Sequence, residues 1–173
     1  VSLHLTTTEE IREACSLAGQ YSPRLLVEKQ IPGRHYRVLV VGDRVVAAAE
    51  RIPASVVGNG TNTIAELIEI TNRDPRRGQG HEKPLTKITV DEVVLACLRR
   101  RGISLEYVPP PGERVLLREN ANLSTGGTAV DVTDQIHPDN ALVALRAART
   151  VGLDVAGVDL VTADISSPLQ EAG

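Results

Sequence analysis

The chain has 173 residues, 42% hydrophobic and 24% charged, which is an ordinary composition for a soluble globular protein. Its formal net charge is −3 and its only aromatic residues are three tyrosines. This argues against a nucleic-acid partner, because such a protein needs a basic field and rings that stack on bases. No run approaches the ~18 apolar residues of a membrane span, and no signal sequence opens the chain. We therefore expect a cytoplasmic protein with no membrane partner, and the opening Val-Ser-Leu without a Met suggests a piece of a longer protein.

Four segments carry the signals of helices. Thr7 with Glu10, and Thr63 with Glu66, each form a Thr-x-x-Glu capping box before apolar residues at helical spacing. Gly102 follows three arginines, a typical helix end. The sequence predicts helices within 6–23, 63–74, 90–102 and 137–153.

Six segments are typical of strands, because they are rich in β-branched residues and bounded by turn residues. The first three, 24–31, 34–41 and 44–52, are joined by tight turns at Pro32-Gly33 and Gly42-Asp43, which predicts an antiparallel meander. Further strands are expected within 114–120, 127–134 and 154–164. This order predicts an α+β fold in which hairpins outnumber parallel crossovers.

Asp159 is a charged residue inside the apolar run "VAGVDLV", which we expect to be buried on both sides. A buried carboxylate needs a metal, an arginine or backbone donors, so a structural ion pair or strand-end cap and a metal ligand are all open interpretations.

The segment 75–89, "PRRGQGHEKPLTKIT", is a polar loop longer than most connections in compact domains. Its basic residues could bind an anion, or they could form a solvated surface, as charged loops commonly do. They are Arg76, Arg77, His81, Lys83 and Lys87.

The stretch 116–134, "LLRENANLSTGGTAVDVTD", contains Arg118, Asn120, Asn122 and the pair Gly126-Gly127 between two predicted strands. An arginine fork and unobstructed backbone amides suit anionic oxygens. The alternative is a hairpin whose turn is Gly-Gly, with the polar side chains capping their own backbone.

Five segments in this order resemble the ATP-grasp region of the cyanophycin synthetase family, and the resemblance spans essentially the whole chain. They are "LLVEKQIPGRHYRVLVV", "VVAAAERIPASVVGNGTNTIAELI", "NRDPRRGQGHEKPLTKI", "LRENANLSTGGTAVDVTD" and "VGLDVAGVDLVTADISSPL". The resemblance implies a partial ATP-grasp domain, incomplete at both ends. It would comprise a helix with nucleotide-hinge strands (1–53), a helical insertion with a basic loop (54–112) and a phosphate- and metal-side lobe (113–173).

The resemblance also implies roles for individual residues. Glu28 and the backbone of Lys29 and Ile31 would lie near the adenine, and His35, where the family has an aspartate, would face the ribose. Asp159 would bind Mg²⁺. Near the phosphates and the acyl phosphate would lie Arg118, Asn120 and Asn122, with His81 near the polymer or the incoming amino acid.

The implied activity is that of an ATP- and Mg²⁺-dependent carboxylate–amine ligase, which forms an acyl phosphate and then an amide. The substrates would be aspartate and a growing aspartate–arginine polymer, and the parent protein would be a homo-oligomer. The family's glycine-rich phosphate loop would precede Val1 and its Glu-Val-Asn strand would follow Gly173, so we expect this chain alone to have little activity. The alternatives are another ATP-grasp amide ligase, of the glutathione-synthase or D-alanine-ligase kind, a non-catalytic nucleotide-binding module and a structural partner-binding domain.

Overall fold

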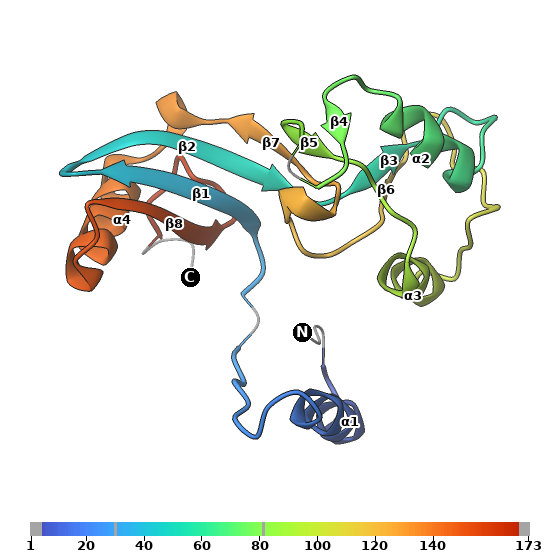
Figure 1. Ribbon diagram of the computed structural model, residues 1–173, viewed down its shortest axis with the longest axis horizontal. Coiled ribbons are helices and arrows are strands. Elements are labelled where there is room, and N and C mark those ends of the chain that lie inside the picture. Colours follow the sequence, from blue (N-terminus) through green and yellow to red (C-terminus); the bar gives the residue numbers. More distant parts are fainter. Residues whose placement is uncertain (1–4, 30, 81, 170–173) are drawn as a thin grey trace. The chain divides into compact units, whose positions relative to one another are not determined.

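The computed structural model describes residues 5–29, 31–80 and 82–169, and the chain divides into two units, Val1–Pro32 and Gly33–Gly173. The first unit contains helix α1 (Thr8–Gly19), followed by residues without regular structure (Figure 1). The predicted capping box is present, since the Thr7 side chain accepts from the Glu10 N–H and the Glu10 side chain accepts from the Thr7 N–H. The predicted first helix is confirmed.

The second unit is built around a four-stranded antiparallel sheet of β1 (Arg34–Val41), β2 (Arg44–Ile52), β7 (Thr128–Asp131) and β8 (Val155–Thr162). The strand order is β7-β2-β1-β8, and the β1–β2 hairpin turns at Gly42 as predicted. The strand predicted over 24–31 is wrong, because the described residues of that segment form no strand. In the predicted meander, 24–31 would pair with β1. In the structure, β8 pairs with that edge of β1 instead.

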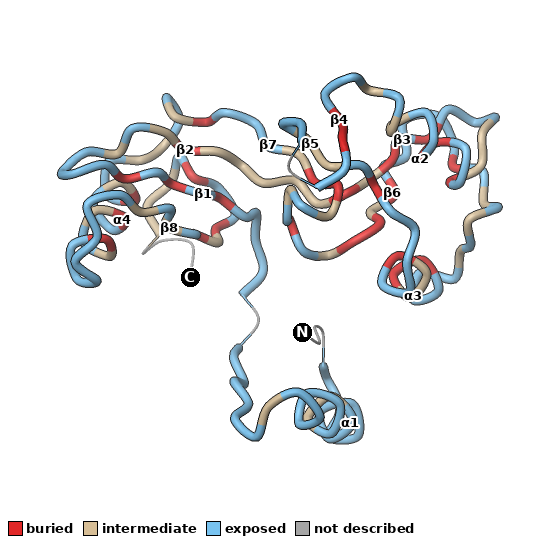
Figure 2. The backbone as a smooth tube through the Cα atoms, in the orientation of Figure 1, coloured by how far each residue is buried: buried red, intermediate tan, exposed pale blue. Residues whose placement is uncertain are grey.

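Helix α4 (Pro138–Val151) covers one face of this sheet (Figure 1). Alternate residues of β1, namely Tyr36, Val38 and Val40, are buried against Ala144 and Ala148 of α4. Figure 2 shows the resulting alternation of buried and exposed positions along β1. The odd-numbered residues of β1 are exposed, so the opposite face of the sheet is open to solvent.

A second core lies where short strands meet helices α2 (Ile64–Asn72) and α3 (Glu92–Arg100). Strand β3 (Ser55–Val57) pairs antiparallel with β6 (Arg114–Leu116), and β4 (Arg77–Gly78) pairs parallel with β5 (Leu85–Thr86). Apolar residues of α2 and α3 and of the β3–β6 sheet with its adjoining residues form this core, including Ile64, Ile68, Leu98, Val115 and Leu117. The predicted α+β class is confirmed.

Strands β6 and β7 flank the glycine-rich stretch, but they belong to different sheets. The hairpin interpretation of residues 116–134 is therefore wrong: β6 pairs with β3, and β7 pairs with β2. Between them the chain forms a 3₁₀ turn (η1, Leu123–Thr125) that ends at Gly126 with φ +96°, and a second such turn (η2, Thr133–Gln135) follows β7. Among the described residues, no helix combines the length and hydrophobicity needed to cross a membrane.

Candidate nucleotide-phosphate and metal site

The open face of the four-stranded sheet carries a cluster of charged side chains at one end. In the register of the sheet, Arg37 on β1 lies opposite Asp159 on β8, and His35 lies opposite Arg51 on β2. Because residues opposite one another on antiparallel strands share a face, all four side chains project from the side that α4 leaves uncovered. Three strands thus bring two arginines, a histidine and a carboxylate together.

Asp159 is the centre of this cluster. Arg37 holds it bidentately, with Nε donating to Oδ1 and Nη2 donating to Oδ2, both at 2.8 Å. Nη1 of Arg51 donates to Oδ1 from the other neighbouring strand at 3.3 Å. The hydrogen bonds from Arg37 lower the pKa of Asp159, with smaller contributions from the charges of Arg51 and His35. The carboxylate is therefore fully ionised at neutral pH.

The expectation that Asp159 is buried on both sides is wrong, since 56% of its side chain is exposed. The reason is that only one face of β8 packs against α4, so the other face stays wet. The expectation that the carboxylate has an arginine partner is met by Arg37 and Arg51, while its role as a metal ligand stays a prediction.

A pocket of about 200 Å³ opens beside Asp159. Arg51 forms one side of it and donates through Nη2 to Asn122 Oδ1 at 3.3 Å, while its buried Nε has no hydrogen-bond partner among the residues that the structure describes. The unsatisfied donor of the guanidinium suits an anionic group, and the half-exposed carboxylate beside it suits a cation bound to that group. The lining residues are His35, Tyr36, Arg51, Asn120, Ala121, Asn122, Asp159 and Leu160.

Two glycines hold the Asn120–Asn122 loop against the end of β2. A Cβ on Gly127 would lie 2.8 Å from the carbonyl oxygens of both Asn122 and Ile52, so only glycine allows this approach. Gly126 has a positive φ of +96°, which glycine adopts without strain. The close approach places Asn122 within reach of Arg51, the penultimate residue of β2.

Arg118 lies elsewhere than the sequence interpretation placed it. Only 6% of it is exposed, and its Nη2 donates to Asp91 Oδ2 at 2.5 Å, at the N-cap of α3. It does not line the pocket, so the structure brings together His35, Asn120, Asn122 and Asp159 but not Arg118. The physical reason is that β6, which ends two residues before Arg118, pairs with β3, and Leu117 is buried in the core of α2 and α3, so Arg118 reaches Asp91.

The remaining predicted site residues lie outside this pocket or outside the described structure. Glu28, Lys29 and Ile31 belong to the first unit and are exposed there. His81 lies outside the described residues. Within the described part of the chain, no group of three or more His, Cys, Asp or Glu side chains is arranged to hold a metal ion.

Sequence reasoning assigned no site role to Arg37 or Arg51, although both contact Asp159. Each is a charged residue within a predicted strand, but neither interrupts an apolar run as Asp159 does. Arg37 follows Arg34 and His35, and Arg51 follows Glu50. Arg37, Arg51 and Asp159 meet only because the strand order is β2-β1-β8. The sequence does not reveal this order, because more than one hundred residues separate β1 from β8.

The arrangement of elements matches a solved structure, that of a bifunctional glutathione synthetase from Pasteurella multocida. The match has a TM-score of 0.68 and 36% sequence identity, and covers 81% of this chain and 19% of that one. The fold is therefore the ATP-grasp fold, as the sequence predicted.

Among curated proteins, the chain is 53% identical over 171 residues to the cyanophycin synthetase of Trichormus variabilis, covering 99% of this chain and 19% of that protein. It is 41% identical to the glutathione biosynthesis bifunctional protein of Clostridium perfringens, covering 94% of this chain and 21% of that protein. The resemblance to the cyanophycin synthetase family is thus confirmed, and the chain spans about a fifth of the length of these relatives. No protein-family model matches the chain.

Proposed function

We propose that this chain supplies the phosphate- and metal-binding side of an ATP-dependent carboxylate–amine ligase of the cyanophycin synthetase kind. The observation that carries the proposal is the exposed Asp159 carboxylate, held by Arg37 and Arg51 beside Asn122 on an open sheet face. The ATP-grasp fold and the identity to synthetases over nearly the whole chain support it.

In the proposed reaction, a substrate carboxylate oxygen attacks the γ-phosphorus of ATP, and ADP leaves. The amine nitrogen then attacks the acyl carbon, loses a proton and expels phosphate, so that an amide bond replaces the acyl phosphate. The substrates we propose are aspartate and a growing aspartate–arginine polymer, in a homo-oligomeric parent enzyme. Such chemistry depends on positioning and on stabilising the charge of the transferred group.

The residues of the pocket fit Mg²⁺ and phosphate. Magnesium prefers carboxylate, phosphate and water oxygens and would draw charge from the phosphates when bound. Asp159 would hold the ion, because its Oδ2 accepts only one hydrogen bond and keeps a lone pair free. Arg51, through its unsatisfied Nε, and Asn122 would hold phosphate oxygens. His35 at the pocket edge stays the proposed ribose contact, and Asn120 would lie near the transferred phosphoryl group.

Arg37 has a positioning role in this proposal. Its bidentate contact fixes both Asp159 oxygens, and the same contact keeps the carboxylate ionised. Only one carboxylate of the described residues lines the pocket, so the chain alone would bind Mg²⁺ weakly and turn over little ATP. The proposed role of His81 toward the polymer or amino acid and those of Glu28, Lys29 and Ile31 toward adenine remain predictions.

Titration calorimetry of the chain with ATP, with and without Mg²⁺, tests the proposal. We expect Mg²⁺ to strengthen ATP binding in the wild type, and Asp159→Asn to remove this dependence while leaving ATP binding without metal intact. Asp154→Asn, an exposed aspartate just before the same strand and outside the pocket, is the control and should behave like the wild type. An unchanged Mg²⁺ dependence in Asp159→Asn would overturn the metal role.

A ligase of the glutathione-biosynthesis kind is a second candidate, favoured by the 41% identity to the Clostridium perfringens protein. The two differ in the amino acid that is joined. In the presence of MgATP, we expect aspartate but not glycine to change the affinity of the chain for nucleotide, and the reverse preference would favour the second candidate.

A further inference from the structure

A second cavity, of about 350 Å³, lies beside the end of α2 and the β4–β5 loop, and shares no lining residue with the pocket at Asp159. This volume is within the range of small-molecule sites. Four basic and two acidic side chains line it, together with Asn72 and Pro75. The basic ones are Arg73, Arg77, Lys83 and Lys87, and the acidic ones are Glu69 and Asp74.

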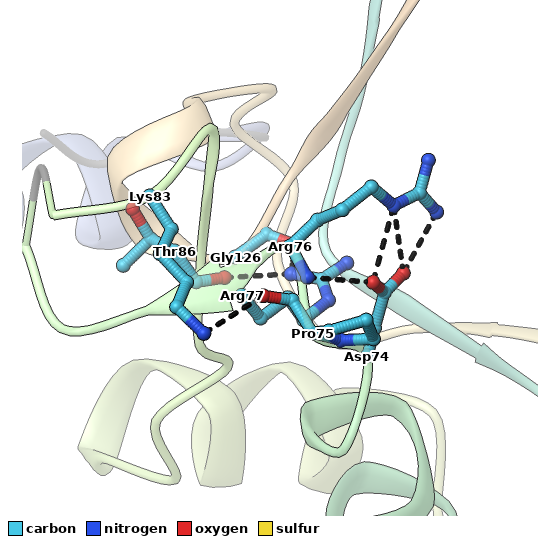
Figure 3. Close-up of polar contacts among 7 residues, drawn as sticks. All are labelled: Asp74, Pro75, Arg76, Arg77, Lys83, Thr86 and Gly126. Carbon is cyan, nitrogen blue, oxygen red and sulfur yellow. Dashed lines mark hydrogen bonds and ion pairs between the residues drawn. The ribbon is translucent and has the colours of Figure 1, made fainter.

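Arg77 is the buried member of this set, with only 6% of the residue exposed. Its Nη1 donates to the carbonyl oxygens of Thr86 at 2.6 Å and Gly126 at 3.0 Å (Figure 3). Among the described residues, Nε and Nη2 of Arg77 have no hydrogen-bond partner and the guanidinium forms no ion pair. Burial lowers the pKa of Arg77, because a charge in an apolar setting lacks the solvation it has in water. A buried cation of this kind calls for an anion.

The nearest carboxylate is already engaged. Asp74 is held by Nε and Nη2 of its neighbour Arg76, at distances from 2.7 to 3.2 Å (Figure 3). These hydrogen bonds lower the pKa of Asp74 to about 2, so it remains an anion committed to Arg76. The cavity therefore keeps an excess of positive charge.

Lys83 is held at the wall of the cavity. Its Nζ donates to the Pro75 carbonyl oxygen at 2.8 Å, which uses one of three donors (Figure 3). Its stem lies over Gly78, where a Cβ would come within 2.9 Å of Lys83 Cγ. The exposed Lys87 adds a further cation on the same wall.

We propose that this cavity binds a carboxylate of a small acidic molecule, with the Nε–Nη2 edge of Arg77 as the bidentate donor and Lys83 and Lys87 as flanking charges. The same edge of Arg37 holds Asp159 elsewhere in this chain, at 2.8 Å for both contacts. A guanidinium fork can hold a carboxylate or a phosphate bidentately, and the carboxylate that Arg37 holds in this way sets our preference. The site shares no lining residue with the proposed nucleotide site, and the hydrogen bond from Arg77 to the Gly126 carbonyl connects its wall to the loop that carries Asn122.

The test is a titration of the ¹⁵N-labelled chain with succinate, and separately with inorganic phosphate, without nucleotide or metal. NMR signals of the Arg77 Nε–H and of the Lys83 and Lys87 amides report binding. We expect saturable shifts with succinate and at least several-fold weaker binding of phosphate. Stronger binding of phosphate, or the absence of saturable shifts at Arg77, would overturn the proposal.

Variants at exposed residues keep the test independent of folding. Lys83→Gln and Lys87→Gln should each weaken succinate binding about five- to tenfold, the scale of one typical hydrogen bond, because both lysines are exposed to solvent. Glu69→Gln should tighten it, because a negative charge leaves the wall. Arg146→Gln removes an exposed charge from α4, outside the cavity, and should have no effect. Equal affinities in all four variants would contradict the site, whatever the outcome of the ATP experiments.

Discussion

At the scale of single residues, arginine partners decide which acidic side chains serve the site and which serve the fold. Asp159 is held on a wet sheet face, where it can still reach a ligand. Asp91 is tied to the buried Arg118, and it also caps α3 by accepting from the N–H groups of Val93 and Val94. Asp159 and Asp91 are both paired with arginines. The buried Arg118 makes the Asp91 pair structural, whereas the exposed Arg37 leaves the Asp159 pair accessible to a ligand.

We predict that Asp91→Asn lowers the free energy of unfolding by about 1–3 kcal/mol, because the substitution leaves the Arg118 cation buried without its partner. Asparagine retains the cap, so Asp91→Ala should cost about 1 kcal/mol more. Urea unfolding measures both. The control is Glu92→Gln, the exposed next residue, which should change stability little. An unchanged free energy of unfolding in Asp91→Asn would show that the Asp91–Arg118 pair does not stabilise the fold.

The same pair predicts a pH dependence. Partial burial acts to raise the pKa of Asp91, but the hydrogen bonds from Arg118 and the α3 amides outweigh it and lower the pKa. A lowered pKa in the folded state stabilises the protein above the unfolded value of about 3.9, and this contribution disappears as the pH falls through the folded value. Urea unfolding between pH 6 and 3 should therefore show a smaller acid-induced loss of stability in Asp91→Asn than in the wild type.

At the scale of elements, local sequence signals correctly predicted the capped helices and the β1–β2 hairpin, whereas pairings between distant strands were not predicted. Both capping boxes form, because Thr7–Glu10 and Thr63–Glu66 are contacts within one turn. Strand partners depend on residues far along the chain: β1 pairs with β8 across more than one hundred residues, which displaces the predicted partner 24–31. The alternative interpretation of a hairpin around Gly126 is wrong for the same reason, since β6 pairs with β3 and β7 pairs with β2.

We predict that Gly126→Ala disturbs the loop that presents Asn122. An added Cβ would meet Ile88 Cγ1 at 2.7 Å and Ile88 Cα at 3.0 Å, in addition to the strain of φ +96°. We expect a loss of about 1–3 kcal/mol in unfolding free energy and weaker ATP binding. Gly152→Ala is the matched control, because φ is +76° but a Cβ there meets nothing within 4 Å. Equal losses in the two variants would mean that packing against Ile88 does not hold the loop.

At the scale of the whole molecule, the second unit contains two buried cores, and the first unit contains helix α1. Core residues from β1, β2, β8 and α4 support the open sheet face, and core residues around α2 and α3 support the basic loop. Helix α1 buries none of its 12 residues and depends on its own hydrogen bonds and cap.

We predict that the amides of α1 exchange with deuterium far faster than those of β1 and β2. Isolated helices of this length are marginal in water, whereas opening the sheet requires loss of its core. Hydrogen exchange followed by NMR measures this difference residue by residue. Equal protection of α1 and β1 would show that α1 is stabilised by packing that its exposure does not reveal.

The site, like the fold, was predictable from the sequence where single residues carried the signal, and not where distant strands had to be paired. Asp159, Asn120 and Asn122 were singled out from the residues themselves and His35 from the resemblance, and all four lie together around one pocket. Arg51 and Arg37 were missed, because their role appears only once β2, β1 and β8 are placed side by side. Arg118 was misplaced, because β6 pairs with β3 beside the second core, and the residues after β6 bring Arg118 to Asp91.

The most direct test of the central claim is where MgATP binds. We expect a titration of the ¹⁵N-labelled chain with MgATP to shift the NMR signals of His35, Arg51, Asn122 and Asp159, and Arg51→Gln to abolish these shifts. Arg44→Gln, at the other end of the same strand, should leave them as they are. Shifts confined to the α4 face of the sheet, or shifts that persist in Arg51→Gln, would contradict a nucleotide-phosphate site on the open face.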